Sequence, residues 1–156
     1  MDYEGTLTNC RQWAQNGQLA AWVHRYLLAE GDNAPLSEGL TEEQAVFHGP
    51  VTMPMYLFNR CSGPAAEGLT FRVGAGWWEY KVARIVEAVK KGADLPPLII
   101  GWRVKEETPD GAFELNDGNH RWEAFRRLGV AEYPVILWCH EEQLPWLLAR
   151  YGQHMA

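Results

Sequence analysis

The sequence predicts an α+β fold in one domain that spans residues 1–156. Two observations predict this class. Apolar residues recur at helical spacing in the first third of the chain and again near residue 80, whereas short runs of β-favouring residues follow from residue 98 onward. A chain of this length with 47% hydrophobic residues can bury a sizeable core without disulfides or a structural metal.

The N-terminal third is predicted to be mainly helical. Apolar positions from residue 9 to 30 follow helical spacing, with Asn16-Gly17 as a break and Gly31 as a stop. Residues 31–40 are rich in Gly, Asp, Asn, Pro and Ser and predict a loop.

A short second helix is expected after this loop. Thr41 followed by Gln44 has the form of a capping box, and Gly49-Pro50 would end the helix. The apolar residues 53–58 are interrupted by proline, and residues 61–76 are expected to be irregular.

The second half alternates helices and strands. A stripe at Trp78, Val82, Ile85 and Val89 predicts a helix that Gly92 closes. The expected elements are a helix over 77–91, a strand over 98–104, a turn over 109–111, a strand over 112–115, a helix over 119–128, a strand over 133–138 and a helix over 141–151.

Composition excludes several classes of protein. The net charge of −6 argues against general nucleic-acid binding, which relies on surplus Lys and Arg. Three widely spaced cysteines indicate neither a disulfide framework nor a zinc motif, and no metal site is predicted. No apolar run reaches the roughly 18–20 residues of a membrane span. We therefore expect a reduced, cytoplasmic protein without a membrane partner, whose eight tryptophans lie mostly in the core or in groove walls.

The turn at residues 117–121 carries the clearest functional signal. Asp117 is a candidate N-cap, and Gly118 permits a sharp exit from the strand and close approach of a ligand to the backbone. The N–H groups of Asn119 and His120, with the helix dipole, favour an anion. Arg121 can grip two oxygens at once, and His120 can donate a hydrogen bond or move a proton. The alternative is a well-capped helix in which these groups are purely structural.

The same turn resembles a known superfamily. The run over 115–124, followed by Leu128-Gly129 and by residues 134–136, resembles the ParB/sulfiredoxin-like superfamily, whose members share a Gly-x-(His/Arg)-Arg turn. Residues 97–100 and Asp110-Gly111 also match its strand and hairpin.

This resemblance covers about residues 95–139. It implies a small mixed β-sheet with helices packed on it. Residues 1–92 would then be a mainly helical extension with the first part of the fold, and residues 141–151 a C-terminal helix.

The resemblance also implies nucleotide binding at the turn. Sulfiredoxin uses ATP, ParB proteins bind and hydrolyse CTP on DNA, and a related kinase phosphorylates free serine. Two departures from the family pattern argue against two of these activities. Asn119 stands where sulfiredoxin has its catalytic cysteine, so sulfiredoxin activity is not expected. The arginine pair of the ParB partition proteins is absent from the turn, so a role in chromosome partition is not expected either. The chain is closer to the kinase-like and uncharacterised branches.

Further candidates surround the turn. Arg60 is a possible second cation, with a solvated loop position equally expected. Glu123 could orient Arg121 or bind magnesium, and a simple surface role is favoured over both. A catalytic carboxylate should also exist, for which Glu79 and Glu114 are guesses. Arg126 and Arg127 are expected to balance the helix dipole.

Two functional hypotheses follow. The first is a nucleotide- or phosphate-binding protein that uses ATP or CTP with magnesium, a phosphotransferase or NTPase with His120 and Glu123 as catalytic candidates. The second is a non-catalytic module that binds DNA or a protein. Helix-start amides covered by other side chains, together with an Arg121 guanidinium turned away into an internal ion pair, would remove the functional reading and leave only the architecture.

Overall fold

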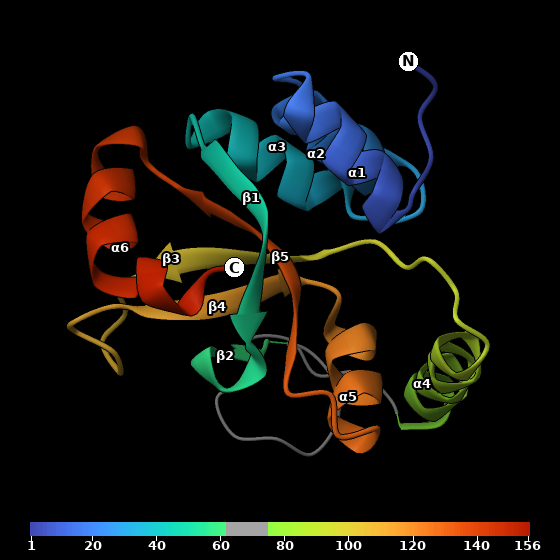
Figure 1. The fold of residues 1–156 in the computed structure, drawn as a ribbon. Coiled ribbons are helices and arrows are strands. Elements are labelled where there is room, and N and C mark those ends of the chain that lie inside the picture. Colours follow the sequence, from blue (N-terminus) through green and yellow to red (C-terminus); the bar gives the residue numbers. More distant parts are fainter. Residues whose placement is uncertain (62–74) are drawn as a thin grey trace.

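A five-stranded mixed sheet organises the chain (Figure 1). The computed structural model describes residues 1–61 and 75–156. The strands are β1 (Val46–Pro54), β2 (Phe58–Arg60), β3 (Leu98–Arg103), β4 (Ala112–Asp117) and β5 (Glu132–Cys139). Their order is β1-β5-β3-β4-β2; β1/β5 and β3/β4 pair antiparallel, whereas β3/β5 and β2/β4 pair parallel. The predicted α+β class is confirmed.

Helices cover both faces of this sheet. They are α1 (Leu7–Gln15), α2 (Leu19–Leu28), α3 (Ala34–Glu42), α4 (Ala75–Lys90), α5 (Asn119–Arg127) and α6 (Leu144–Tyr151), with the short 3-10 turns η1 (Met55–Leu57), η2 (Glu141–Gln143) and η3 (Gly152–His154). Across residues 1–61 and 75–156, none of the helices has the length and apolar character needed to cross a bilayer.

Alternate residues of the central strands point to opposite faces, as the period of two requires. Ile99 and Ile136 are fully buried among residues of α1, α2 and α3. Their strand neighbours Leu98, Ile100 and Leu137 are buried on the other face, in the cluster that also holds residues of α5 and α6. The N-terminal helices therefore form one layer, the sheet a second, and α5 with α6 a third.

The predicted helical break in the N-terminal third is confirmed, because α1 ends before Gly17 and α2 begins at Leu19. The next two predictions are wrong. Residues 34–42 form α3, which starts at the Asn33 N-cap with proline in its first turn.

The capping-box reading of Thr41 fails because this residue lies inside α3, where its hydroxyl donates to the Ser37 carbonyl. The segment after it extends into β1 instead of a second helix, because Val46 and Phe47 pair with β5. The described part of residues 1–92 thus contributes the strands β1 and β2 as well as the helices α1 to α4.

From residue 75 onward the predicted elements are confirmed to within a few residues. The expected turn over 109–111 lies between β3 and β4, and the expected C-terminal helix is divided between η2 and α6. The prediction of irregular structure over 61–76 falls mainly on residues outside the described ranges.

Helix α4 lies at the edge of the molecule beside α5 (Figure 1). Its buried stripe contributes Trp78 and Val82 to a small separate core completed by Ala124 of α5. One side of α4 is thus anchored, and the adjacent side borders the turn between β4 and α5.

Candidate functional site

The turn between β4 and α5 has the sharp geometry that the sequence predicts. Gly118 is the N-cap of α5 with φ of 99°, in the left-handed region. A Cβ atom there would lie 2.4 Å from Leu98 Cδ2 and 2.8 Å from Arg121 Nη2. Glycine is therefore required by both backbone conformation and space. Asp117, the expected N-cap, is instead the last residue of β4, and its carboxylate accepts a hydrogen bond from Arg121 rather than from a helix amide.

The Arg121 guanidinium faces the interior, which corrects the expectation that it grips a phosphate. Its Nη1 donates to the carbonyls of Pro96 and Pro97, and its Nη2 donates to the Tyr26 hydroxyl at 2.9 Å and to Asp117 Oδ2 at 3.1 Å. These four bonds use four of the five N–H donors of an arginine. The side chain is 8% exposed. Arg121 therefore ties α2, the lead-in to β3 and the end of β4 to α5.

The buried partner of this arginine is Asp117. Burial raises the pKa of the Asp117 carboxyl, while the Arg121 guanidinium and hydrogen bonds from Tyr26 and Asn33 act in the opposite direction. A buried guanidinium and carboxylate that satisfy each other have a structural role, so neither offers an uncompensated charge to a ligand.

Asn119 and Arg60 also lie near the turn, and both are buried against other parts of the fold. The Asn119 side chain accepts a hydrogen bond from the Cys61 backbone N–H at 2.7 Å, which fastens the end of β2 to α5. Arg60 is 9% exposed, and its guanidinium lies over the Trp78 ring at 4.9 Å. The solvated-loop reading of Arg60 is wrong, because the residue is buried with its guanidinium against an aromatic ring. The second-cation reading stays a prediction.

The carboxylate candidates point elsewhere. Glu123 is buried, not on the surface, and pairs with Arg126 at 2.6 Å. Glu79 pairs with Arg127 at 2.7 Å, and Glu114 pairs with residues 103 and 105. None of the three lines the pocket described below. The expected catalytic role of Glu123 therefore has no geometric support, and Arg126 and Arg127 are engaged in ion pairs.

His120, in contrast, lines a pocket that a ligand could enter. Its ring lies 4.4 Å from the Trp78 ring, centre to centre. Burial, with the positive charges of Lys81 and Arg121, lowers the pKa of His120 to about 4. The imidazole is thus neutral at pH 7, with one nitrogen that donates and one that accepts. At this pH it is a hydrogen-bonding group rather than a cation or an efficient general base.

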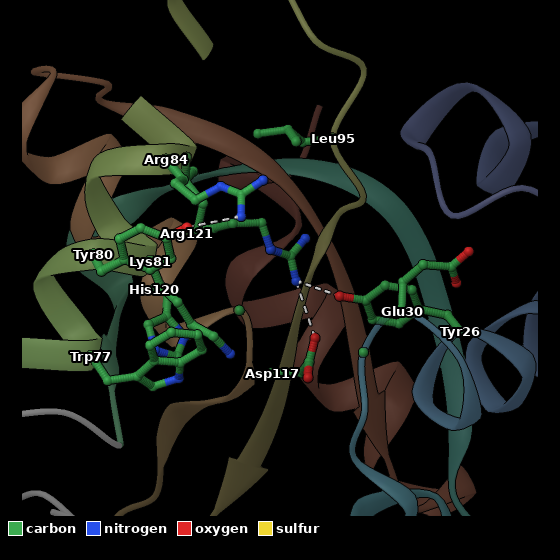
Figure 2. A pocket seen from close by; sticks show the side chains of 13 residues that line it. Tyr26, Glu30, Trp77, Tyr80, Lys81, Arg84, Leu95, Asp117, His120 and Arg121 are labelled. Carbon is green, nitrogen blue, oxygen red and sulfur yellow. Dashed lines mark hydrogen bonds and ion pairs between the residues drawn. The ribbon is translucent and has the colours of Figure 1, made fainter. Parts of the chain in front are cut away.

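A pocket of about 350 Å³ opens beside the turn (Figure 2). Its walls come mainly from the end of α2, one side of α4 and the start of α5, with one residue each from the lead-in to β3 and the end of β4. The residues that line it are Tyr26, Glu30, Gly31, Trp77, Tyr80, Lys81, Arg84, Ile85, Leu95, Asp117, Gly118, His120 and Arg121.

The first turn of α5 contributes backbone donors to this pocket. The first N–H groups of a helix have no acceptor within the helix. Within residues 1–61 and 75–156, the N–H groups of His120 and Arg121 have no hydrogen-bond acceptor, whereas that of Trp122 bonds to the Gly118 carbonyl. The helix dipole adds partial positive charge at the same place.

Helix α4 supplies the wall that sequence reasoning missed. Trp77 and Tyr80 are 65% and 51% exposed, and their rings stack at 5.3 Å with an interplanar angle of 22°. Lys81 Nζ lies 5.4 Å from the centre of the Trp77 ring, and the Arg84 guanidinium lies 5.7 Å from that of Tyr80. These residues recur at spacings of three, one and three, next to the apolar stripe. The sequence signal that could have revealed this wall is the pair of aromatic residues next to the apolar stripe of the helix.

The two sides of the pocket differ in charge. Lys81, Arg84 and the start of α5 make one side positive, whereas Glu30, just past the end of α2, places a carboxylate on the other (Figure 2). The Glu30 carboxylate also accepts a hydrogen bond from the Tyr3 hydroxyl. A ligand that carries an anionic group at one end and hydroxyl or amino groups at the other would match this division.

No protein-family model matches the chain, and the search of curated proteins finds no match either. The resemblance to the ParB/sulfiredoxin-like superfamily therefore depends on the residues of the turn and the strands around it. In the described part of the chain, no three His, Cys, Asp or Glu side chains gather as a metal-binding group.

Proposed function

We propose that the pocket between α2, α4 and the first turn of α5 binds a nucleotide through its phosphate groups. One observation carries this proposal: a cavity of about 350 Å³ brings together the helix-start amides, two cationic side chains and an exposed aromatic pair. The resemblance to the ParB/sulfiredoxin-like superfamily supports the same ligand class. The three cysteines, free in this structure, are compatible with a reducing, cytoplasmic setting as part of the proposal.

The phosphates would lie at the start of α5. The N–H groups of His120 and Arg121 donate to their oxygens, the neutral His120 ring can donate one further bond, and Lys81 adds a full positive charge. The Arg121 guanidinium takes no part in this contact. Its role is to hold the turn in the shape that exposes the amides.

The base and sugar would lie against the remaining walls. The stacked pair of Trp77 and Tyr80 offers a partly exposed aromatic surface, and base–aromatic stacking contributes about 1–3 kcal/mol per base. Glu30 repels phosphate and accepts hydrogen bonds, so it suits sugar hydroxyls or an exocyclic amine.

Binding is better supported than turnover. Phosphoryl transfer uses metal ions and a residue that positions the nucleophile. Of the two carboxylates among the described lining residues, Asp117 is committed to Arg121, which leaves Glu30. Magnesium commonly uses one or two carboxylates together with the substrate's own phosphates. Because Glu30 lies on the side of the pocket away from the start of α5, a magnesium ion that accompanies ATP or CTP would be held by the phosphates, without a carboxylate from the described lining residues.

Thermal unfolding with ATP, CTP and GTP, each with and without magnesium, tests the proposal. A nucleotide at 100 times its Kd should stabilise the protein by about 2.7 kcal/mol, a rise in Tm of about 5–10 °C. Lys81→Ala should reduce this rise. Lys90→Ala is the matched control, because Lys90 lies on the same helix, pairs with Glu87 and does not line the pocket.

Two results would contradict the proposal. Indifference of the wild-type protein to every nucleotide would exclude the ligand class. Equal losses in the Lys81 and Lys90 variants would show that general charge, rather than this pocket, holds the nucleotide.

A further inference from the structure

Tyr80 and Arg84 form a ridge between two hollows on α4. Both residues line the nucleotide pocket, and both also line a second, more open hollow of about 580 Å³ farther along the helix. The Arg84 Nη1 donates to the Tyr80 hydroxyl at 3.3 Å, so the two side chains support each other. A ligand that crosses this ridge would enter the second hollow.

The second hollow has an apolar floor and a positive end. Its lining consists of Tyr80, Ala83, Arg84, Glu87, Ala88, Lys91 and Ala93. Glu87 faces Lys90 at 3.7 Å, which offsets its charge. Lys91 makes no ion pair within residues 1–61 and 75–156, so its ammonium remains available to an anion.

The cations along α4 have a spacing that suits a strand of phosphates. Ten residues separate Lys81 from Lys91, about 15 Å along a helix at about 1.5 Å per residue. Successive phosphates of one strand advance by about 3.4 Å along the axis of a stacked helix. The face from Trp77 to Lys91 is therefore long enough for several nucleotides, and exposed aromatic rings interleaved with cations are the usual surface for single-stranded nucleic acid.

We propose that the ligand is the end of a single-stranded oligonucleotide. Its terminal nucleotide occupies the pocket at the start of α5, and the chain crosses the Tyr80–Arg84 ridge so that the adjoining phosphates meet Arg84 and Lys91. This inference rests on the proposed function, because it extends the ligand of the same pocket. The cations that contact the strand lie on one face of α4, so the net charge of −6 of the whole chain does not oppose this local contact.

A second copy of this chain is another partner that the exposed pair of Trp77 and Tyr80 could contact. Interleaved cations argue against it, because a symmetric contact through this face would bring Lys81, Arg84 and Lys91 of both copies together. The mass of the protein in solution, measured with the binding experiment, distinguishes the two occupants.

Fluorescence anisotropy with labelled ten-nucleotide probes, oligo(dT) and oligo(U), tests the inference against competition by TTP and UTP. We expect the oligomers to bind at least about tenfold more tightly than the mononucleotides. Lys91→Ala should weaken oligomer binding several-fold, lower the salt dependence by about 0.7 in slope for one lost phosphate contact, and leave mononucleotide binding unchanged. Arg11→Ala, at an exposed position of α1 outside both hollows, should change neither. A difference between the two probes would show whether DNA or RNA is preferred.

The outcomes separate the two proposals. Equal affinity for mononucleotides and oligomers, or equal effects of the Arg11 and Lys91 variants, would overturn the oligonucleotide proposal while leaving the nucleotide pocket intact. Failure of both ligand types to bind would overturn the pocket as well. A dimeric mass that Trp77→Ala converts to monomer, without oligomer binding, would assign the face to a second copy.

Discussion

Replacing Arg121 separates a structural role from a ligand-binding role. Arg121→Met keeps most of the aliphatic stem but removes the guanidinium, which leaves the buried Asp117 carboxylate without its cation and also removes the bonds to Pro96, Pro97 and Tyr26. Breaking a buried ion pair by removing one partner costs about 3–5 kcal/mol. At this chain length each kcal/mol lowers Tm by about 2–4 °C, so the expected drop is about 6–20 °C.

Urea unfolding, monitored by circular dichroism, measures this loss of stability. Arg127→Met is the control, since its pair with Glu79 is exposed to solvent and should contribute little to stability. The double variant Asp117→Asn with Arg121→Met should be more stable than Arg121→Met alone, because no charge is left unpaired in the interior. A loss below about 1 kcal/mol in Arg121→Met, together with complete loss of nucleotide binding, would refute the structural assignment and restore Arg121 as a ligand contact.

Two further predictions concern the turn itself. Gly118→Ala should cost about 1–3 kcal/mol more than Gly129→Ala, because both positions have positive φ but only at Gly118 would the new Cβ meet Leu98 at 2.4 Å; equal costs in urea would disprove the steric requirement. His120 should titrate near pH 4 by NMR, and bound phosphate should raise this midpoint by about one unit; a free-protein midpoint near 6.5 would contradict the burial of the ring. Because the pKa of His120 is lowered in the folded state, the free energy of unfolding should fall as the pH is lowered from about 6.5 toward 4. The free energy of unfolding of His120→Phe should change less over the same pH range.

The sequence predicts the second half of the fold well because its signals are local. The stripe of α4 and the glycine that begins α5 each act through neighbouring residues. It predicts the segment over 34–54 poorly. Val46 and Phe47 become a strand by pairing with β5, and no local pattern carries that long-range contact.

The candidate site shows the same division. The turn at Gly118 is where the sequence places it, and His120 lines the pocket as expected. The roles of Asp117 and Arg121 were misread because a residue's type does not reveal which way its side chain points. Tyr26 reaches Arg121 across 95 residues of sequence, and such a partner is visible only in the folded chain.

The central claim is that the backbone amides at the start of α5 receive the ligand's phosphate. Amide chemical shifts in ¹H–¹⁵N spectra, recorded during titration with ATP or CTP, test it most directly. The His120 and Arg121 amides should show the largest saturable downfield shifts, while the amide of Gly129, past the other end of α5, should not move. A nucleotide that raises the Tm without shifting either of the two amides would contradict the claim and place the ligand elsewhere.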